Sequence, residues 1–173
     1  LVESQPFIEA VRQISLEVGR ENSLFIHVTL VPFLSGSDEH KTKHTQHSVK
    51  ELQGMGINPD IIVLRCDRPL EEEVFRKIAM FCNVSEDCVI ENLTLPCLYE
   101  APIMLEASGF SGVVCRELGI DAEEPELKEW EEMVERIKNT GSSVKIALVG
   151  KYTGLHDAYL SVLEALKHAG CED

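Results

Sequence analysis

The first pattern of apolar and polar positions along the chain is that of an amphipathic helix between Pro6 and Gly19. Ser4 can cap this helix, a proline fits its first turn, and a glycine is a common residue just past a helix end. The apolar positions recur at helical spacing and would form one stripe: Phe7, Ile8, Val11, Ile14 and Val18. The pattern predicts a helix that buries one face.

Two nearly continuous apolar runs, residues 24–31 (LFIHVTLV) and 61–64 (IIVL), are typical of buried strands. Between them a helix is predicted from about Thr45 to Gly56, with apolar positions at Val49, Leu52 and Met55. A strand, a helix and a strand with short joints form a βαβ crossover, so the two strands are expected to be parallel. We expect the first strand to be covered on both faces.

The middle of the chain continues this alternation of helix and strand. A helix is predicted over residues 72–81 and a third short strand at Val89–Ile90, while residues 93–112 show a weaker helical pattern interrupted by proline and glycine. Alternating strands and helices predict an α/β fold, with a parallel sheet and flanking helices.

The last third of the chain has a different character. An acidic helix with a narrow apolar face is predicted over residues 126–137, and residues 139–143 (NTGSS) have the composition of a linker. Residues 144–149 (VKIALV) then resemble the first strand of a new α/β domain, and a helix follows through Leu166. We therefore expect a domain boundary at the linker.

Composition and charge limit the classes of partner. The chain has 173 residues, a formal net charge of -14 and no apolar run long enough to span a bilayer. This acidity argues against general binding to nucleic acids or anionic membranes. The six cysteines form no C-x-x-C pair, so buried thiols in the cytoplasm and no metal site are expected. Because the first residue is Leu1 and not Met, a piece of a longer polypeptide is expected.

One short basic segment stands out in this acidic chain. No acidic residue lies between His40 and Lys50, and the segment offers ammonium, hydroxyl and carboxamide groups: Lys41, Thr42, Lys43, His44, Thr45 and Gln46. It follows the first predicted strand, and open α/β sheets bind ligands at the carboxyl ends of their strands. We interpret it as one wall of a nucleotide triphosphate pocket. The alternative is an ordinary helix start whose lysines contact only water.

Two catalytic motifs are absent from the sequence. The segment Gly150–Thr153 (GKYT) follows a predicted strand, but position 145 is Lys where a phosphate loop needs its first glycine, and Tyr152 replaces its hydroxyl residue. There is also no G-x-S-x-G or G-x-C-x-G elbow for an acyl-transfer nucleophile.

Several segments together resemble the CTP synthase family. They occur in the family's order over essentially the whole chain: residues 3–13 (ESQPFIEAVRQ), 41–52 (KTKHTQHSVKEL), 59–63 (PDIIV), 77–84 (KIAMFCNV), 149–152 (VGKY), 157–159 (DAY) and 164–168 (EALKH). In that family an amidoligase (synthetase) domain, related to P-loop NTPases of the dethiobiotin synthetase type, precedes a class I glutamine amidotransferase domain.

The resemblance implies a division of this chain. Residues 1–118 would be the carboxyl-terminal part of the amidoligase domain, which makes them a partial P-loop NTPase-like domain. Residues 119–143 would be an acidic helix and an interdomain linker, and residues 144–173 the truncated beginning of the amidotransferase domain.

The resemblance also implies an activity for the parent protein. Family members phosphorylate O4 of UTP with ATP and Mg²⁺, then displace the phosphate with ammonia from glutamine to give CTP, with GTP as an allosteric activator. They are cytoplasmic homotetramers. The phosphate loop, the magnesium carboxylates and the glutaminase triad of the family are not matched here, so we expect this chain alone to be inactive. The alternative is a non-catalytic module for pyrimidine-nucleotide sensing or assembly.

The resemblance assigns binding residues but no catalytic residue and no metal ligand. The UTP and CTP contacts would be Lys41, Thr42, Lys43, His44, Thr45, Gln46 and Lys77. The CTP feedback pocket would include Glu3 and Phe81, and the adenine of ATP would lie against Leu93, Thr94 and Leu95. Two positions depart from the family pattern: His44 replaces a proline, and Leu1 replaces an aspartate.

Overall fold

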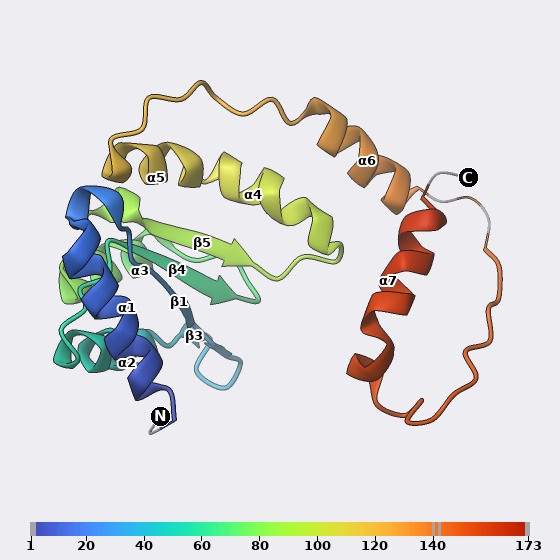
Figure 1. Ribbon diagram of the computed structural model, residues 1–173, viewed down its shortest axis with the longest axis horizontal. Coiled ribbons are helices and arrows are strands. Elements are labelled where there is room, and N and C mark those ends of the chain that lie inside the picture. The colour runs from blue at the N-terminus through green and yellow to red at the C-terminus, as the bar shows by residue number, and fades with distance from the viewer. Residues whose placement is uncertain (1–2, 140, 142, 172–173) are drawn as a thin grey trace. The chain divides into compact units, whose positions relative to one another are not determined.

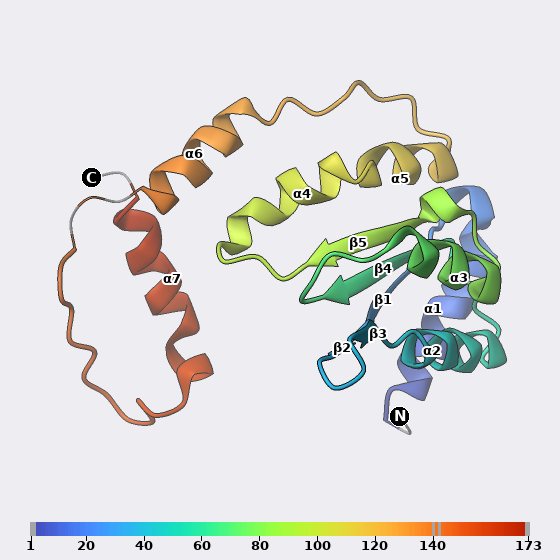
Figure 2. The ribbon, with the colours of Figure 1, turned by 180° about the vertical axis from the view of Figure 1, so that it is seen from behind.

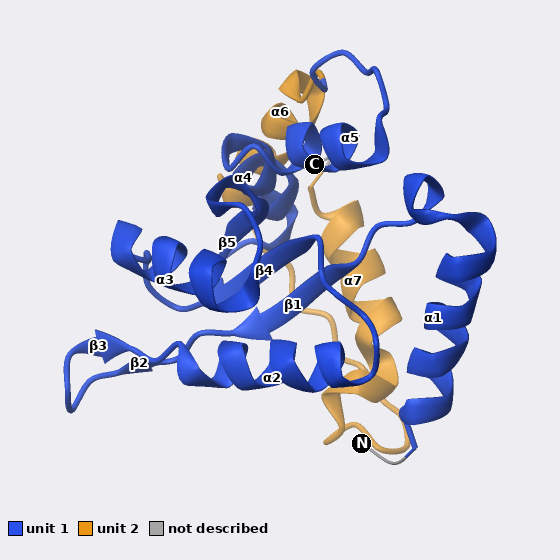
Figure 3. Cartoon of the chain, turned by 90° about the vertical axis from the view of Figure 1, so that its left-hand side faces the viewer, with its two compact units in different colours: residues 1–125 blue, residues 126–173 orange. Residues whose placement is uncertain are grey.

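A computed structural model describes residues 3–139, 141 and 143–171 of the chain. Contacts between residues divide the chain into two compact units, residues 1–125 and residues 126–173 (Figure 3). The expectations about Leu1 and about two of the linker residues, Thr140 and Ser142, lie outside the described residues.

A parallel sheet of three strands forms the centre of the first unit (Figure 1). The strands are β1 (Ile26–Leu30), β4 (Ile61–Cys66) and β5 (Val89–Leu93), in the order β1-β4-β5. Ile26 pairs with Ile61 and Ile62 pairs with Val89, so the three strands run in one direction. The predicted α/β fold with a parallel sheet is confirmed.

Among the described residues the first unit contains five α-helices, of which all but the first pack against the sheet. They are α1 (Gln5–Val18), α2 (Lys43–Gly54), α3 (Glu72–Cys82), α4 (Ala101–Ala107) and α5 (Phe110–Leu118), with 3₁₀ turns at Arg20–Asn22, Glu86–Cys88 and Leu98–Glu100. Because side chains alternate along a strand, Ile62 and Leu64 of β4 pack with α2 and α3, whereas Ile61 and Val63 pack with α5 on the other face.

The expectation that β1 is covered on both faces is wrong. His27 contacts Ser48 of α2 through a hydrogen bond of 2.9 Å, and Thr29 likewise points toward α2. The alternate residues Ile26, Val28 and Leu30 are exposed, Val28 by 59%. Strand β1 is at the edge of the sheet, so a continuous apolar run did not indicate burial on both faces.

Helix α1 has the predicted extent but not the predicted burial. It ends where Gly19 adopts a φ of 87°, a conformation that a side chain would disfavour. No described residue of α1 is buried, and Phe7 is exposed by 76%. Within the described residues the apolar stripe of this helix therefore has little to pack against.

The second unit contains α6 (Lys128–Lys138), a 3₁₀ turn at His156–Tyr159 and α7 (Leu160–Ala169). The predicted acidic helix is thus confirmed. The strand predicted over residues 144–149 is not: these residues form no regular element, and Val149 is exposed by 92%. A strand requires a neighbour for its backbone hydrogen bonds, and this segment pairs with none in the described chain. No helix among the described residues is long and apolar enough to cross a membrane.

Candidate functional site

The basic segment lies just beyond the carboxyl end of β1. A short antiparallel hairpin, β2 (Phe33–Leu34) and β3 (Glu39–His40), follows β1, and α2 begins three residues later at Lys43. Figure 2 shows the hairpin leading directly into α2. Strands β4 and β5 end at the same edge of the sheet, where open α/β sheets bind ligands.

Lys41 connects the hairpin to the helix and is fixed through its backbone. Its N–H donates to the carbonyl of Pro32 at 2.9 Å. Its ammonium group forms an ion pair with the carboxylate of Glu39, and the side chain stays partly exposed. Lys41 therefore presents a cation at the edge of the sheet.

Two of the predicted contact residues, Thr42 and Thr45, are buried. Thr45 is completely buried, and its hydroxyl lies 3.3 Å from that of Thr29 in β1. Thr42 is also buried, and its hydroxyl accepts a hydrogen bond of 3.1 Å from the carboxamide of Gln46. These side chains hold α2 against β1 and order its first turn.

Lys43 and His44 are the exposed residues of that first turn. The first four N–H groups of a helix have no partner within the helix. A proline at position 44 would therefore remove no hydrogen bond of the α2 ladder, and His44 restores an N–H group that the helix does not use. The departure from the family pattern leaves α2 intact.

Helix α3 brings a second lysine to the same place. The positive charges of Lys41 and Lys77 both act on the carboxylate of Glu39 and lower its pKa, the Lys41 hydrogen bond being the largest cause. Phe81 is exposed one turn beyond Lys77. Lys41 thus contacts the Glu39 carboxylate directly, whereas Lys77 acts on it only through its charge.

Glu3 is not brought to this group in the described chain. It is exposed and precedes α1, and Figure 3 shows α1 and α3 on opposite sides of the first unit, with β1 and α2 between them. The predicted pairing of Glu3 with Phe81 in a feedback pocket therefore has no contact to support it among residues 3–125, and stays a prediction.

The predicted adenine-binding residues lie at the end of β5. Leu93 is the last residue of that strand, and the N–H of Thr94 donates to the carbonyl of Cys66 at 2.8 Å. The hydroxyl of Thr94 donates to Asp67, which follows β4, at 2.7 Å. Leu95 is partly buried. These residues and the basic segment share one edge of the sheet, with the end of β4 between them.

Sequence reasoning missed four residues at this edge. Asp67 and Arg68 directly follow β4, and the guanidinium of Arg68 lies 4.0 Å from the centre of the Phe33 ring. Glu39 and His40 form β3. The position of Asp67 and Arg68 after a predicted parallel strand was a usable signal, because ligands bind at strand ends. The hairpin gave no such signal, since its strands have only two residues each.

His40 ties the hairpin to the start of α3. Its side chain is only 2% exposed, its ring lies edge-on to Phe33 at 5.0 Å, and its Nδ1 lies 3.0 Å from Oε2 of Glu71. The other ring nitrogen, Nε2, is buried and has no hydrogen-bond partner within the described residues. This contact holds β3 next to the helix that carries Lys77.

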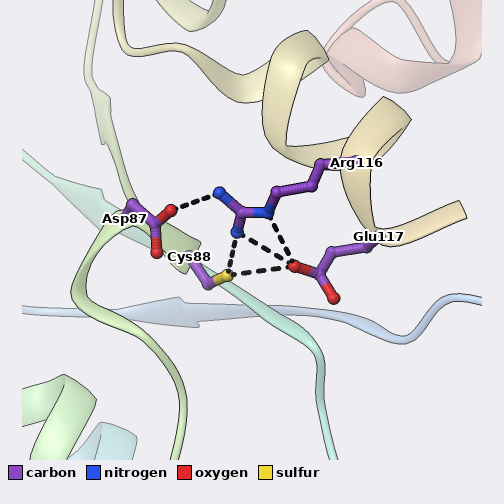
Figure 4. A network of polar contacts seen from close by, with 4 residues as sticks. All are labelled: Asp87, Cys88, Arg116 and Glu117. Atoms are coloured by element: carbon purple, nitrogen blue, oxygen red, sulfur yellow. Dashed lines mark hydrogen bonds and ion pairs between the residues drawn. The ribbon is translucent and has the colours of Figure 1, made fainter. Parts of the chain in front are cut away.

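A second polar network lies at the opposite end of β5 (Figure 4). Arg116 of α5 pairs with Asp87, donates to Glu117 at 2.9 Å, and donates to the sulfur of Cys88 at 3.3 Å. The hydrogen bond from Arg116 lowers the pKa of Asp87, and burial raises the pKa of the Cys88 thiol. Asp87 and Cys88 precede β5, so this network fastens α5 to the sheet and lies away from the candidate site.

Magnesium has no evident set of ligands in the part of the chain that is described. No three His, Cys, Asp or Glu side chains gather closely enough there to hold a metal ion. Mg²⁺ favours carboxylate oxygens together with phosphates of the substrate. No residue of this chain is therefore assigned to it.

The chain is similar to known proteins over nearly its whole length. The family model described as "CTP synthase N-terminus" matches residues 2–120. The CTP synthase of Ruminiclostridium cellulolyticum is 57% identical over 169 residues, which are 98% of this chain and 32% of that protein. The CTP synthases of Pelotomaculum thermopropionicum and Caldanaerobacter subterraneus are 56% and 54% identical over the same shares.

The chain corresponds to one region of its longer relatives. The chain spans about a third of the length of these relatives, and the family model places residues 2–120 in the family's N-terminal region. That placement does not support the expected carboxyl-terminal half of a synthetase domain. The match to the family model ends at residue 120, before the expected start of an amidotransferase domain at residue 144, so that domain stays a prediction. By the family match and by the identity of its relatives, the chain belongs to the CTP synthase family.

Proposed function

We propose that the first unit carries part of a site for a pyrimidine nucleoside triphosphate, UTP or CTP, in a protein that aminates UTP to CTP. The observation that carries this proposal is the place of Lys41 and Lys43, which follow the hairpin at the carboxyl edge of the sheet, where Lys41 forms an ion pair with Glu39. These cations lie at the carboxyl edge of a parallel sheet, in a family whose members are CTP synthases. The fold thus assembles positive charge where such a sheet binds ligands.

The electrostatics of the chain favour a local anion site. With a formal net charge of -14, the molecule as a whole repels a triphosphate, so an anion must be captured by nearby cations. Lys41, Lys43 and Lys77 are compact, mobile charges suited to phosphate oxygens. The exposed His44 and the partly buried Gln46 are the polar side chains nearest in sequence that can contact a ribose or a base.

The rest of the reaction is proposed from the family. ATP would bind with its adenine against residues 93–95, and ammonia from glutamine would be the nitrogen source. Mg²⁺, activation by GTP and a homotetramer are further predictions for the parent protein, and no residue of this chain is assigned to them. The beginning of an amidotransferase domain at residues 144–173 likewise stays a prediction.

Calorimetric titration of the chain with UTP and with CTP tests the site. Lys41→Ala and Lys77→Ala are each expected to weaken binding by about 10- to 100-fold, because each removes a charge-assisted contact with phosphate. Lys50→Ala is the matched control, since Lys50 is an exposed lysine further along α2. Folding should be unchanged in all three, as far-ultraviolet circular dichroism would show. Equal affinity in the Lys41 and Lys77 variants and the unaltered chain would refute the proposed site.

A turnover assay separates the enzyme fragment from the alternative functions. The isolated chain, supplied with UTP, ATP, Mg²⁺ and ammonia, is expected to form no CTP, because its sequence has no phosphate loop to hold the transferring group. CTP formation above background would contradict this. Addition of the chain to a longer family member lacking these residues would restore turnover if the chain is a catalytic part, and would not if it is only a sensing module.

A further inference from the structure

The Lys41 ammonium already has an anionic partner supplied by the chain itself. Glu39, two residues earlier, forms an ion pair with it. Ser37 also donates a hydrogen bond to this carboxylate, and the charge of Lys77 acts on it, so the pKa of Glu39 is lowered, with Lys41 as the main cause. At neutral pH the carboxylate is therefore ionised and contacts Lys41 of the proposed nucleotide site.

The backbone of Glu39 is held in place. In the β2–β3 hairpin, Leu34 pairs with Glu39 and Phe33 pairs with His40. The next residue along, His40, is buried and contacts Glu71 at 3.0 Å, which fastens β3 to the start of α3. The carboxylate therefore reaches the lysines from a fixed strand, which reduces the conformational entropy lost in forming the ion pair.

A triphosphate and this carboxylate require the same ammonium group, that of Lys41. When a phosphate oxygen approaches Lys41, either Glu39 gives up its partner or two anions lie close together around one cation. Both alternatives cost free energy, because like charges repel and an ion pair that is broken must be resolvated. The same carboxylate would disfavour weak anions that cannot compete for the lysines.

We propose that Glu39 is an internal counter-ion of the nucleotide site, which competes with the phosphates of UTP or CTP for Lys41 and so lowers the affinity of the site for these nucleotides. This inference rests on the proposed function of the site. A competing carboxylate and a merely supporting one differ in the sign of the change in nucleotide affinity when the carboxylate is removed. A carboxylate that merely supported the loop would weaken binding when removed, whereas a competing carboxylate strengthens binding when removed.

The test compares Glu39→Gln with Glu51→Gln. Glutamine has nearly the shape of glutamate and can still accept a hydrogen bond from Lys41, so the hairpin is retained. Glu51 is an exposed glutamate of α2, and its replacement changes the net charge by the same amount. UTP and CTP are titrated by calorimetry at low ionic strength with a chelator present, so that no divalent cation bridges phosphate and carboxylate.

The Glu39→Gln chain is expected to bind about two- to fivefold more tightly, the range of partly exposed ion pairs, with a smaller gain at high salt. Glu51→Gln is expected to match the unaltered chain. Equal gains in both variants, no gain, or weaker binding in Glu39→Gln would overturn the inference while leaving the nucleotide site in place. Binding only after Glu39→Gln would support it. If no variant binds a nucleotide, the proposed function fails and the inference fails with it.

Discussion

Two apolar segments of this chain have a similar composition and different structures. Residues 61–66 (IIVLRC) form β4, the central strand of the sheet, with Ile61, Ile62 and Leu64 completely buried. Residues 144–149 (VKIALV) form no strand, and Val144 is exposed by 84%. Both segments are rich in β-branched and aliphatic residues, which favour strands.

The difference lies in the neighbours of each segment. Strand β4 has β1 on one side and β5 on the other, so its backbone groups are paired, and helices cover both of its faces. Among the described residues, the segment 144–149 has no such partner. A strand gains its hydrogen bonds and burial from residues distant in sequence, so composition alone does not decide whether it forms.

The largest expected contrast between the two units is in thiol reactivity. Burial raises the pKa of Cys66 in β4 to about 12, from an ordinary 9.0. At neutral pH this leaves roughly a thousandfold less reactive thiolate than in an ordinary thiol. Cys171 of the second unit is partly exposed. Timed alkylation followed by mass spectrometry should label Cys171 long before Cys66. Denaturant should make the rates similar, and equal rates in the native chain would contradict the burial of Cys66.

Truncation of matched leucines compares the two segments directly. Leu64→Ala removes a completely buried side chain from the core and is expected to lower the free energy of unfolding by about 2–5 kcal/mol. Leu148→Ala, in the unpaired segment, should change it by less than about 0.5 kcal/mol. Urea unfolding followed by circular dichroism measures both. Similar losses in the two variants would mean that residues 144–149 are buried in solution.

A substitution at Asp60 tests how much one contact between the starts of β1 and β4 contributes to stability. Its carboxylate accepts the N–H of Phe25 at 2.9 Å, which links the segments just before β1 and β4, and also pairs with Arg20. Asp60→Ala leaves the Phe25 N–H without this partner, so a loss of about 1–3 kcal/mol is expected. The control Arg20→Ala removes only the exposed partner and should cost clearly less in the same unfolding experiment. Equal losses would assign the effect to the ion pair.

The smallest expected effect concerns ion pairs in the two units. Arg116 lowers the pKa of Asp87 below its ordinary 3.8, so the pair stabilises the fold above that pH, and the stabilisation is lost as pH falls through the lowered pKa. Asp87→Asn should therefore lower the melting temperature slightly at pH 7 and not at strongly acidic pH. Solvent screening keeps the effect small, since both groups are half exposed.

Glu164→Gln is the matched variant in the second unit. Glu164 pairs with Lys167 three residues later in α7, so the contact joins no separate elements. A still smaller change in melting temperature is expected. A larger change for Glu164→Gln than for Asp87→Asn at pH 7 would contradict the role of Arg116 in fastening α5 to the sheet.

Local sequence signals were sufficient for most elements of the first unit. Helical spacing predicted α1, α2 and α3, and short apolar runs predicted β1, β4 and β5, because these patterns follow from the periodicity of side chains. They were insufficient for burial. The apolar faces of α1 and β1 are exposed among the described residues, since burial depends on which other element lies against a face.

For the candidate site, too, the sequence predicted some features and not others. Residues 41–46 were identified as a basic segment because they contain two lysines and no acidic residue, in a chain that is acidic as a whole. Sequence did not indicate that Thr45 of α2 packs against β1, because a threonine in the first turn of a helix can face either solvent or core. Nor did it indicate that the charge of Lys77 acts on the carboxylate of Glu39, because Lys77 is 38 residues away from Glu39 in the chain.

The sequence by itself determined the α/β class, the alternation of helices with parallel strands, and the resemblance to the CTP synthase family. These follow from local periodicity and from segments that can be compared residue by residue. Only the tertiary structure decided which apolar runs became strands, which faces were covered, and which charges met at the edge of the sheet. Those outcomes depend on contacts between residues far apart in the chain, and no local pattern encodes them.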